Sequence, residues 1–204
     1  PPTRWPIDSI IATLRKDKPF VLEKSFLFLF ALAHCTEAIL GSSASNLYRT
    51  ECLQQNPFRT DFGTVGDGAW GLQNALSVRF GITPLVCSTF RLHPKAYAAS
   101  EYAVNDLTGK LFTLARETYL EKAARDVAFG AEAREFHFAE LLRELERYLA
   151  CQRRLEQCRR SRWPWGLNPA AWRSRAKRGQ HAQAIEKLKA AAILNFERRA
   201  RSGS

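Results

Sequence analysis

The sequence contains no methionine and few cysteines. The shortage of cysteine excludes a disulfide-rich scaffold, and the lack of methionine bears on how the chain is processed. The five cysteines, at positions 35, 52, 87, 151 and 158, are too few and too scattered for the disulfide framework of a small secreted scaffold. Because methionine is absent even at position 1, we expect a processed start. Residues 1–18 lack the features of a secretory signal, whereas the earlier removal of an organellar targeting peptide is compatible with the sequence.

Acidic residues are scarce only near the end of the chain. Residues 1–150 contain 17 Lys and Arg against 17 Asp and Glu, and residues 151–204 contain 14 against 3. The net charge of +11 therefore arises in the last quarter. This asymmetry predicts a neutral helical body, residues 1–150, followed by a basic C-terminal extension, residues 151–204, with a tryptophan-rich loop and a terminal amphipathic helix.

No uncharged stretch is long enough for an ordinary membrane span. The most apolar run, Phe26 to Ala33, lies in a window of 12 residues without formal charge between Lys24 and Glu37. A spanning helix needs about 20 mainly apolar residues. We therefore predict that Phe20–Leu40 is a buried helix. The alternative is a short or tilted membrane helix whose His34 and Glu37 face protein.

The spacing of apolar residues predicts a mainly α fold of several packed helices with irregular loops. Hydrophobic residues make up 46% of the chain, enough to fill a core and to exclude a wholly disordered protein. A long helical segment is predicted over residues 106–160, with Gly109 and Gly130 as the points where it bends or divides. Its late apolar set indicates helix-on-helix packing. Other predicted elements are helices over 44–55, 70–80 and 94–104, a loop over 56–71, an extended segment over 82–92, a break over 161–180 and a terminal helix around 185–200.

Two motifs suggest chemistry but lack the residues that the chemistry needs. Gly66 to Gly71 spells G-x-G-x-x-G, yet no apolar strand precedes it and no acid follows at the expected distance. We interpret it as a glycine-rich loop anchored by Trp70. His137 with Glu140 could share a helix face, but Arg134 stands where a metal-binding pair needs a carboxylate. We therefore predict no catalytic residue, no metal, no cofactor and no small-molecule substrate.

The strongest functional signal is a run of basic and tryptophan residues in the extension. Between positions 153 and 178 a single acid, Glu156, accompanies nine cations. Guanidinium groups bind phosphate oxygens, and indole rings favour a boundary between polar and apolar surroundings. We predict that this segment binds anionic lipid headgroups, RNA or an acidic protein neighbour, against the alternative of a solvated loop with its tryptophans packed on the protein's own core. The predicted binding residues are Arg153, Arg154, Arg159, Arg160, Arg162, Trp163, Trp165, Trp172, Arg173, Arg175, Lys177 and Arg178.

These features together favour a non-catalytic accessory subunit of a mitochondrial membrane complex, such as a respiratory or ATP synthase complex. The expected location is the inner membrane or its matrix face, and the expected partners are other subunits and anionic lipid. The alternative is an RNA-binding structural protein of the mitochondrial ribosome, in which the same basic extension would contact ribosomal RNA. An enzyme of an unrecognised type comes third.

Overall fold

The computed structural model describes residues 8, 11–12, 17–34, 46–85, 107–160 and 168–202, and within these ranges the chain is mainly helical, as predicted. The predicted helix over 94–104 lies outside the described residues. In chain order the elements are β1 (Phe20–Leu22), α2 (Lys24–Ala33), α3 (Thr50–Gln55), the 3-10 helix η2 (Thr60–Val65), α4 (Gly66–Asn74), β2 (Phe80–Ile82), α6 (Leu107–Arg125), α7 (Val127–Glu135), α8 (Phe138–Arg160) and α9 (Pro169–Ser202).

Helix α2 is the centre of the hydrophobic core. Every residue from Ser25 to Ala33 is buried, and the helix packs against α4, α7, α8 and α9 of the same chain. Phe28 meets Phe138 edge to face with ring centroids 5.5 Å apart. The buried helix is therefore confirmed, although it is shorter than predicted because a strand precedes it and the helix ends at Ala33.

No helix in the described ranges has the length and apolar character needed to cross a membrane.

The two strands form a small antiparallel sheet beside α4. Phe20 pairs with Ile82 and Leu22 with Phe80. The extended segment was predicted over 82–92, but the strand ends at Ile82, so the predicted start is wrong, and residues 86–92 lie outside the described residues. The strand also has a partner that the local pattern did not indicate. The predicted loop over 56–71 and helix over 70–80 are also shifted. The helix α4 begins at Gly66 and ends at Asn74.

The long helical segment is three helices, and neither predicted glycine divides it. The Asp126 side chain accepts a hydrogen bond from the Phe129 backbone N–H at 3.0 Å and so starts α7. His137 has a positive φ of 55°, a left-handed conformation that separates α7 from α8. Gly109 and Gly130 lie inside helices. A capping side chain and a left-handed residue therefore set the helix boundaries. A single glycine inside a helix costs only about 1 kcal/mol and is not enough to end it.

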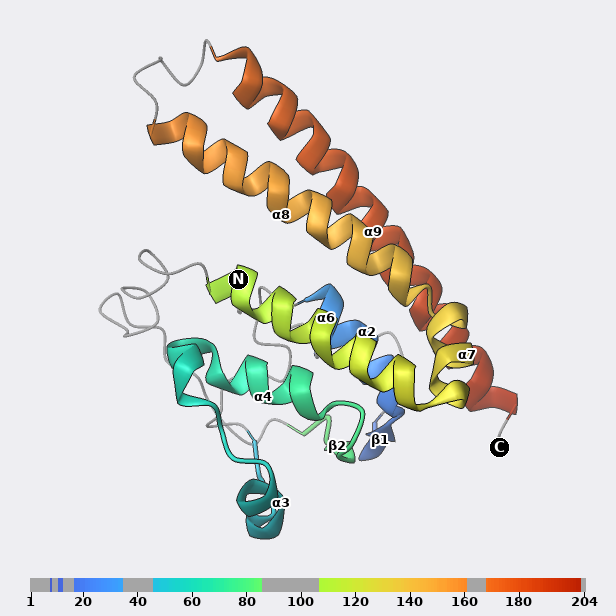
Figure 1. Ribbon diagram of the computed structural model, residues 1–204. Coiled ribbons are helices and arrows are strands. Elements are labelled where there is room, and N and C mark those ends of the chain that lie inside the picture. The colour runs from blue at the N-terminus through green and yellow to red at the C-terminus, as the bar shows by residue number, and fades with distance from the viewer. Residues whose placement is uncertain are drawn as a thin grey trace.

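Helices α8 and α9 form a long antiparallel hairpin that extends beyond the rest of the molecule (Figure 1). This pairing confirms the predicted helix-on-helix packing, here within one chain. The extension was predicted to break over 161–180, but α9 already begins at Pro169. The Asn168 Oδ1 accepts the Ala170 N–H at 3.0 Å, and proline suits the first helical position.

The C-terminal half of α9 is fixed to the core by rings and by one arginine. Phe26 and Phe196 stack with centroids 4.3 Å apart. The Arg199 guanidinium binds Glu23 at 2.6 Å and Glu135, and it lies over the ring of Phe136. Its hydrogen bond lowers the pKa of Glu135, whereas burial raises the pKa of Glu23 despite the same arginine. The basic extension therefore contributes to the core of the body.

Candidate polyanion-binding surface

The hairpin leaves the body at an ion pair between its two helices. The His181 Nδ1 and the Glu144 Oε2 lie 2.7 Å apart, and the hydrogen bond lowers the pKa of Glu144. The main core cluster reaches Leu145 on α8 and Ile185 on α9. Toward the tip of the hairpin, beyond these positions, the buried side chains lie in the contact between α8 and α9, which we call the seam. We call residues 149–160 and 168–178 the projecting hairpin.

Small and medium side chains hold the projecting hairpin together. Cys151 and Leu155 on α8 are buried, as are Ala171 and Ser174 on α9. Cys151 and Cys158 lie two turns apart on α8, a distance of roughly 10 Å along the axis that rules out a bridge between them. The seam has no aromatic ring in the described residues, so it occupies little of the surface of each helix and leaves the rest to solvent.

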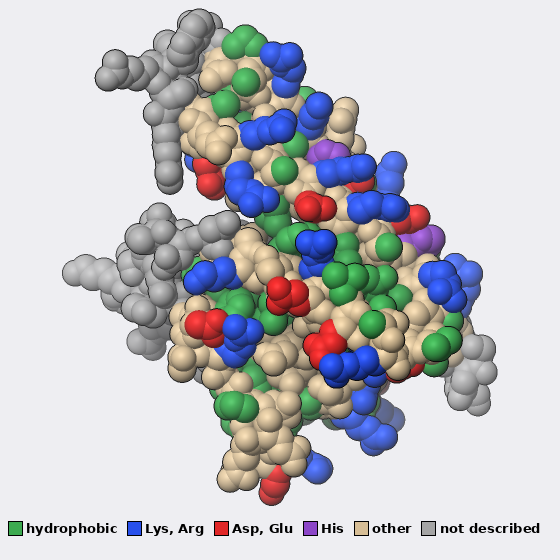
Figure 2. Space-filling view, viewed as in Figure 1, with side chains coloured by type: hydrophobic (Ala, Val, Ile, Leu, Met, Phe, Trp, Pro, Cys, Tyr) green, Lys and Arg blue, Asp and Glu red, His purple; other side chains and the backbone are tan. Residues whose placement is uncertain are grey.

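The structure brings most of the predicted binding residues onto this projecting hairpin. Arg153 to Arg160 lie on a helix, as predicted, whereas Trp172 to Arg178 lie on α9 and not in the predicted break. Figure 2 shows a group of Lys and Arg side chains on the visible face of the hairpin's upper end. Arg162, Trp163 and Trp165 lie outside the described residues, and so does the side chain of Arg160. The exposed members are Arg153, Arg154, Arg159, Trp172, Arg173, Arg175 and Lys177, and Arg178 is half-buried.

Two grooves run along opposite flanks of the seam. The first, which we call the acid-free groove, has a volume of about 560 Å³ and is lined by Cys151, Arg154, Gln157, Cys158, Asn168, Ala170, Arg173, Ser174 and Lys177. The second, which we call the Glu156 groove, has a volume of about 100 Å³ and is lined by Gln152, Leu155, Glu156, Arg159, Arg175 and Arg178. Each groove takes cations from both helices. Only the first has no carboxylate.

Cations outnumber acids on the projecting hairpin, and three of the cations lack a carboxylate partner among the described residues. Within the described residues, no carboxylate forms an ion pair with Arg153, Arg154 or Lys177. Nearer the body the pattern reverses, since Arg147 binds Glu144 and Lys189 binds Glu186. Like charges at this density repel one another and attract a polyanion.

Trp172 adds an exposed aromatic surface among the cations. Its side chain is 65% exposed on the first turn of α9. The alternative that the tryptophans pack on the protein's own core therefore does not hold for Trp172. An exposed indole beside arginines can stack on a base or lie among lipid headgroups.

Elsewhere the described part of the chain offers no group of His, Cys, Asp and Glu that could hold a metal ion. The His137 Nδ1 pairs with the Glu140 Oε2 at 3.1 Å, while Glu144 binds His181. The glycine motif opens α4 after a 3-10 helix, not after a strand. Trp70 is buried and its Nε1 donates to the carbonyl of Asn56 at 2.6 Å, so its anchoring role is confirmed, on a helix and not in a loop.

Sequence reasoning missed the polar residues that line the acid-free groove, namely Gln157, Asn168 and Ser174. The signal for their position was present in the pair Asn168 and Pro169, which is typical of a helix start. A helix beginning there would have placed Ser174 and Lys177 beside each other on one face.

Comparison of the chain with protein-family models, with curated proteins and with solved structures gives no match. What the protein does is therefore inferred from the charge, shape and exposure of its own residues.

Proposed function

We propose that the protein is a non-catalytic structural component of an RNA–protein assembly and that its projecting hairpin binds RNA phosphates. The observation that carries this proposal is the excess of positive charge on that hairpin. Eight Lys and Arg lie on its two helices, at 153, 154, 159, 160, 173, 175, 177 and 178, with Glu156 as the single acid. Contacts between Lys or Arg and phosphates supply most of the sequence-independent affinity for nucleic acids.

The distribution of these cations favours a folded RNA over a membrane surface. Arg154 and Lys177 lie on one flank of the seam, Arg159 and Arg175 on the other. A planar layer of headgroups contacts one side of such a hairpin, whereas phosphate backbones that meet in a folded RNA reach it from several sides. Trp172 can then stack on an unpaired base, which is worth about 1–3 kcal/mol.

The packing of α2 removes one reason to expect a lipid neighbour. In the sequence, the apolar run suggested either a buried helix or a short or tilted membrane helix. Helices α4, α7, α8 and α9 of the same chain cover it. An accessory role in a mitochondrial membrane complex, with Trp172 and its neighbouring arginines at headgroups, is the competing proposal. The mitochondrial location stays a prediction under both.

Binding of the full chain to a stem-loop RNA and to vesicles containing phosphatidylserine tests the proposal. We expect tight, strongly salt-dependent binding to the RNA, measured by fluorescence anisotropy, and no co-sedimentation with the vesicles. The combined variant Arg153→Gln, Arg154→Gln, Lys177→Gln should weaken RNA binding by at least about tenfold, since hydrogen bonds to charged groups contribute roughly 1.5–3 kcal/mol each before solvent screening.

A matched control removes three exposed cations from the body, in the variant Arg79→Gln, Lys110→Gln, Arg116→Gln. It has the same net charge as the hairpin variant, and we expect it to bind RNA nearly as well as the parent chain. Binding to vesicles without binding to RNA would replace this proposal with the lipid one. Binding to neither would leave an acidic protein surface as the partner.

A further inference from the structure

We infer that the acid-free groove is the site that holds a phosphodiester of the RNA backbone in direct contact, and that the Glu156 groove on the opposite flank adds only weaker, longer-range attraction to phosphates. The inference rests on the proposed function and deepens it, because it assigns the direct contact to one flank of the hairpin.

The cations of the acid-free groove come from both helices and converge on one space. Arg154 projects from α8, and Arg173 and Lys177 project from α9. The latter two are four residues apart, so they lie on the same face of α9 one turn from each other. A guanidinium binds two phosphate oxygens at once, and an ammonium adds a compact point charge. Such a set can hold one phosphate from two sides.

The groove also holds neutral hydrogen-bond donors from Ser174 and Asn168. Ser174 is only 7% exposed, lines the groove and makes no hydrogen bond with the described residues. A buried hydroxyl without a partner is costly, and a phosphate oxygen would accept a hydrogen bond from it. Asn168 uses its Oδ1 to cap α9, which leaves its Nδ2 to donate. Cations and donors thus share one lining.

The Glu156 groove provides a comparison within the same hairpin. It too has three arginines, Arg159, Arg175 and Arg178, but Glu156 lies among them. A carboxylate lowers the attraction of such a site for phosphate, since like charges repel. The space is also smaller, about 100 Å³ against about 560 Å³. Equal numbers of cations therefore predict unequal binding.

Two triple variants of the full chain separate the flanks while removing the same charge. In the first, Arg154, Arg173 and Lys177 become Gln; in the second, Arg159, Arg175 and Arg178 become Gln. With a stem-loop RNA as the probe, we expect the first to bind at least about tenfold more weakly and, because one phosphate contact is lost, its log–log salt slope to be shallower by about 1. The second should bind less than about threefold more weakly.

Ser174→Ala supplies a milder variant in case a triple variant is poorly folded. It keeps every charge, and we expect a several-fold loss of RNA affinity with an unchanged circular dichroism spectrum. Equal losses in the two triple variants, or no effect of Ser174→Ala, would overturn the groove assignment while leaving RNA binding in place. If the parent chain fails to bind RNA, the proposed function fails instead.

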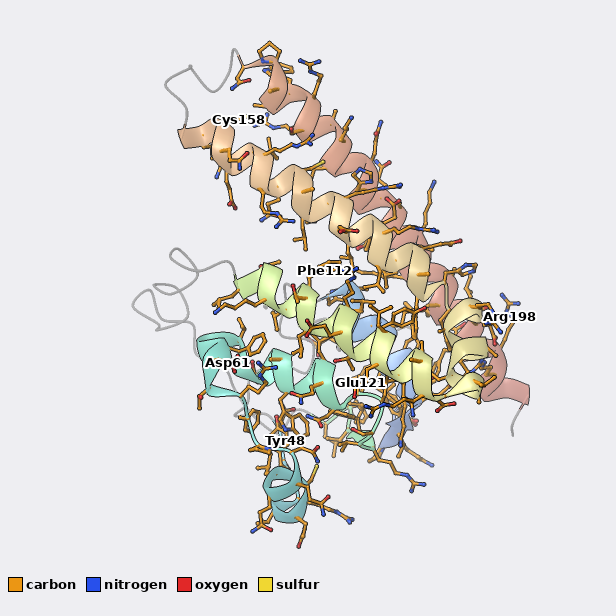
Figure 3. All side chains as sticks on the ribbon, in the orientation of Figure 1. Tyr48, Asp61, Phe112, Glu121, Cys158 and Arg198 are labelled. Carbon is orange, nitrogen blue, oxygen red and sulfur yellow. The ribbon has the colours of Figure 1, made fainter. Side chains whose placement is uncertain are left out.

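A cysteine in the lining gives a readout that does not depend on affinity. Cys158 lines the acid-free groove and is half-buried, and Figure 3 labels it near the end of α8. Cys52 on α3 is also half-buried and serves as the reference. We expect the stem-loop RNA to slow alkylation of Cys158 by N-ethylmaleimide about tenfold and to leave Cys52 unchanged, as measured by peptide mass spectrometry. Unaltered alkylation of Cys158 in the RNA complex would overturn the inference.

Discussion

The two ends of the α8–α9 hairpin are built by the same pair of helices but from different residues. At the body end, Phe138 and Leu141 of α8 and Phe196 of α9 enter the core around α2. At the projecting end, the seam consists of smaller side chains such as Cys151 and Ala171. Because aromatic residues bury the most apolar area, stability is concentrated at the body end. The projecting end contributes little to the core and so can carry other residues on its outer surface.

Charge follows the same division. At the body end, Arg147, Lys189 and Arg199 have carboxylate partners. At the projecting end, Arg153, Arg154 and Lys177 have none among the described residues. A region selected for stability alone would gain from paired charges, since unscreened repulsion destabilises a fold. The unpaired set therefore points to a partner outside the chain.

Truncation of the core should have the largest effect. Phe28 is fully buried, and Phe28→Ala removes its contact with Phe138. We expect a loss of about 3–5 kcal/mol in the free energy of unfolding, because a cavity opens in the core. Urea denaturation followed by tryptophan fluorescence measures it. Leu120→Ala, at an exposed site on α6, is the control and should change stability by less than about 0.5 kcal/mol. A loss below about 1 kcal/mol for Phe28→Ala would contradict the central role of α2.

Truncation of the hairpin seam should have a smaller and local effect. Leu155 is buried outside the main core cluster. We expect Leu155→Ala to lower the stability of the projecting hairpin by about 2 kcal/mol, near the lower end for buried leucines. Amide hydrogen exchange should accelerate in residues 149–160 and 168–178 and remain unchanged in α2. An equal acceleration in α2 would show that the two ends unfold as one unit.

Replacing a helical glycine by alanine in each region tests the same comparison with stabilising substitutions. A Cβ added to Gly179 in α9 or to Gly130 in α7 would meet nothing within 4 Å. Each Gly→Ala substitution should stabilise its helix by about 0.5–1 kcal/mol. Gly130→Ala, in the body, should raise the thermal midpoint. Gly179→Ala should instead slow amide exchange only in the projecting hairpin. A raised thermal midpoint for this variant would contradict the separation of the two ends.

The smallest effect concerns pH at the point where the ends meet. The hydrogen bond from His181 lowers the pKa of Glu144 below its ordinary value of 4.5. The carboxylate therefore contributes stability above that value and loses it as the pH falls below. Because the pair is partly exposed, we expect only a few tenths of a kcal/mol. Glu144→Gln should remove this acid sensitivity from hydrogen exchange of the hairpin below about pH 4.5. A variant as acid-sensitive as the parent chain would exclude the role of this pair.

Local patterns predicted the helices well where their signal was periodic, and poorly where one side chain decided a boundary. The apolar spacing of Leu141 and Leu145 placed α8 correctly. The ends of α7 depended on the cap by Asp126 and on the left-handed His137, and the glycines were a misleading guide. The strand partner of Phe20 lies about sixty residues away in sequence, and no local pattern indicates such a pairing.

The sequence by itself determined the helical class and the concentration of positive charge near the C-terminus, since periodicity and charge are properties of neighbouring residues. Only the tertiary structure decided that α9 folds back along α8. That antiparallel pairing brings Arg154 beside Arg173 and Lys177 and places Glu156 on the other flank. It also decided that the chain covers α2 with its own helices. Both outcomes depend on contacts between distant segments, which are selected by the total apolar area buried and not by any local pattern.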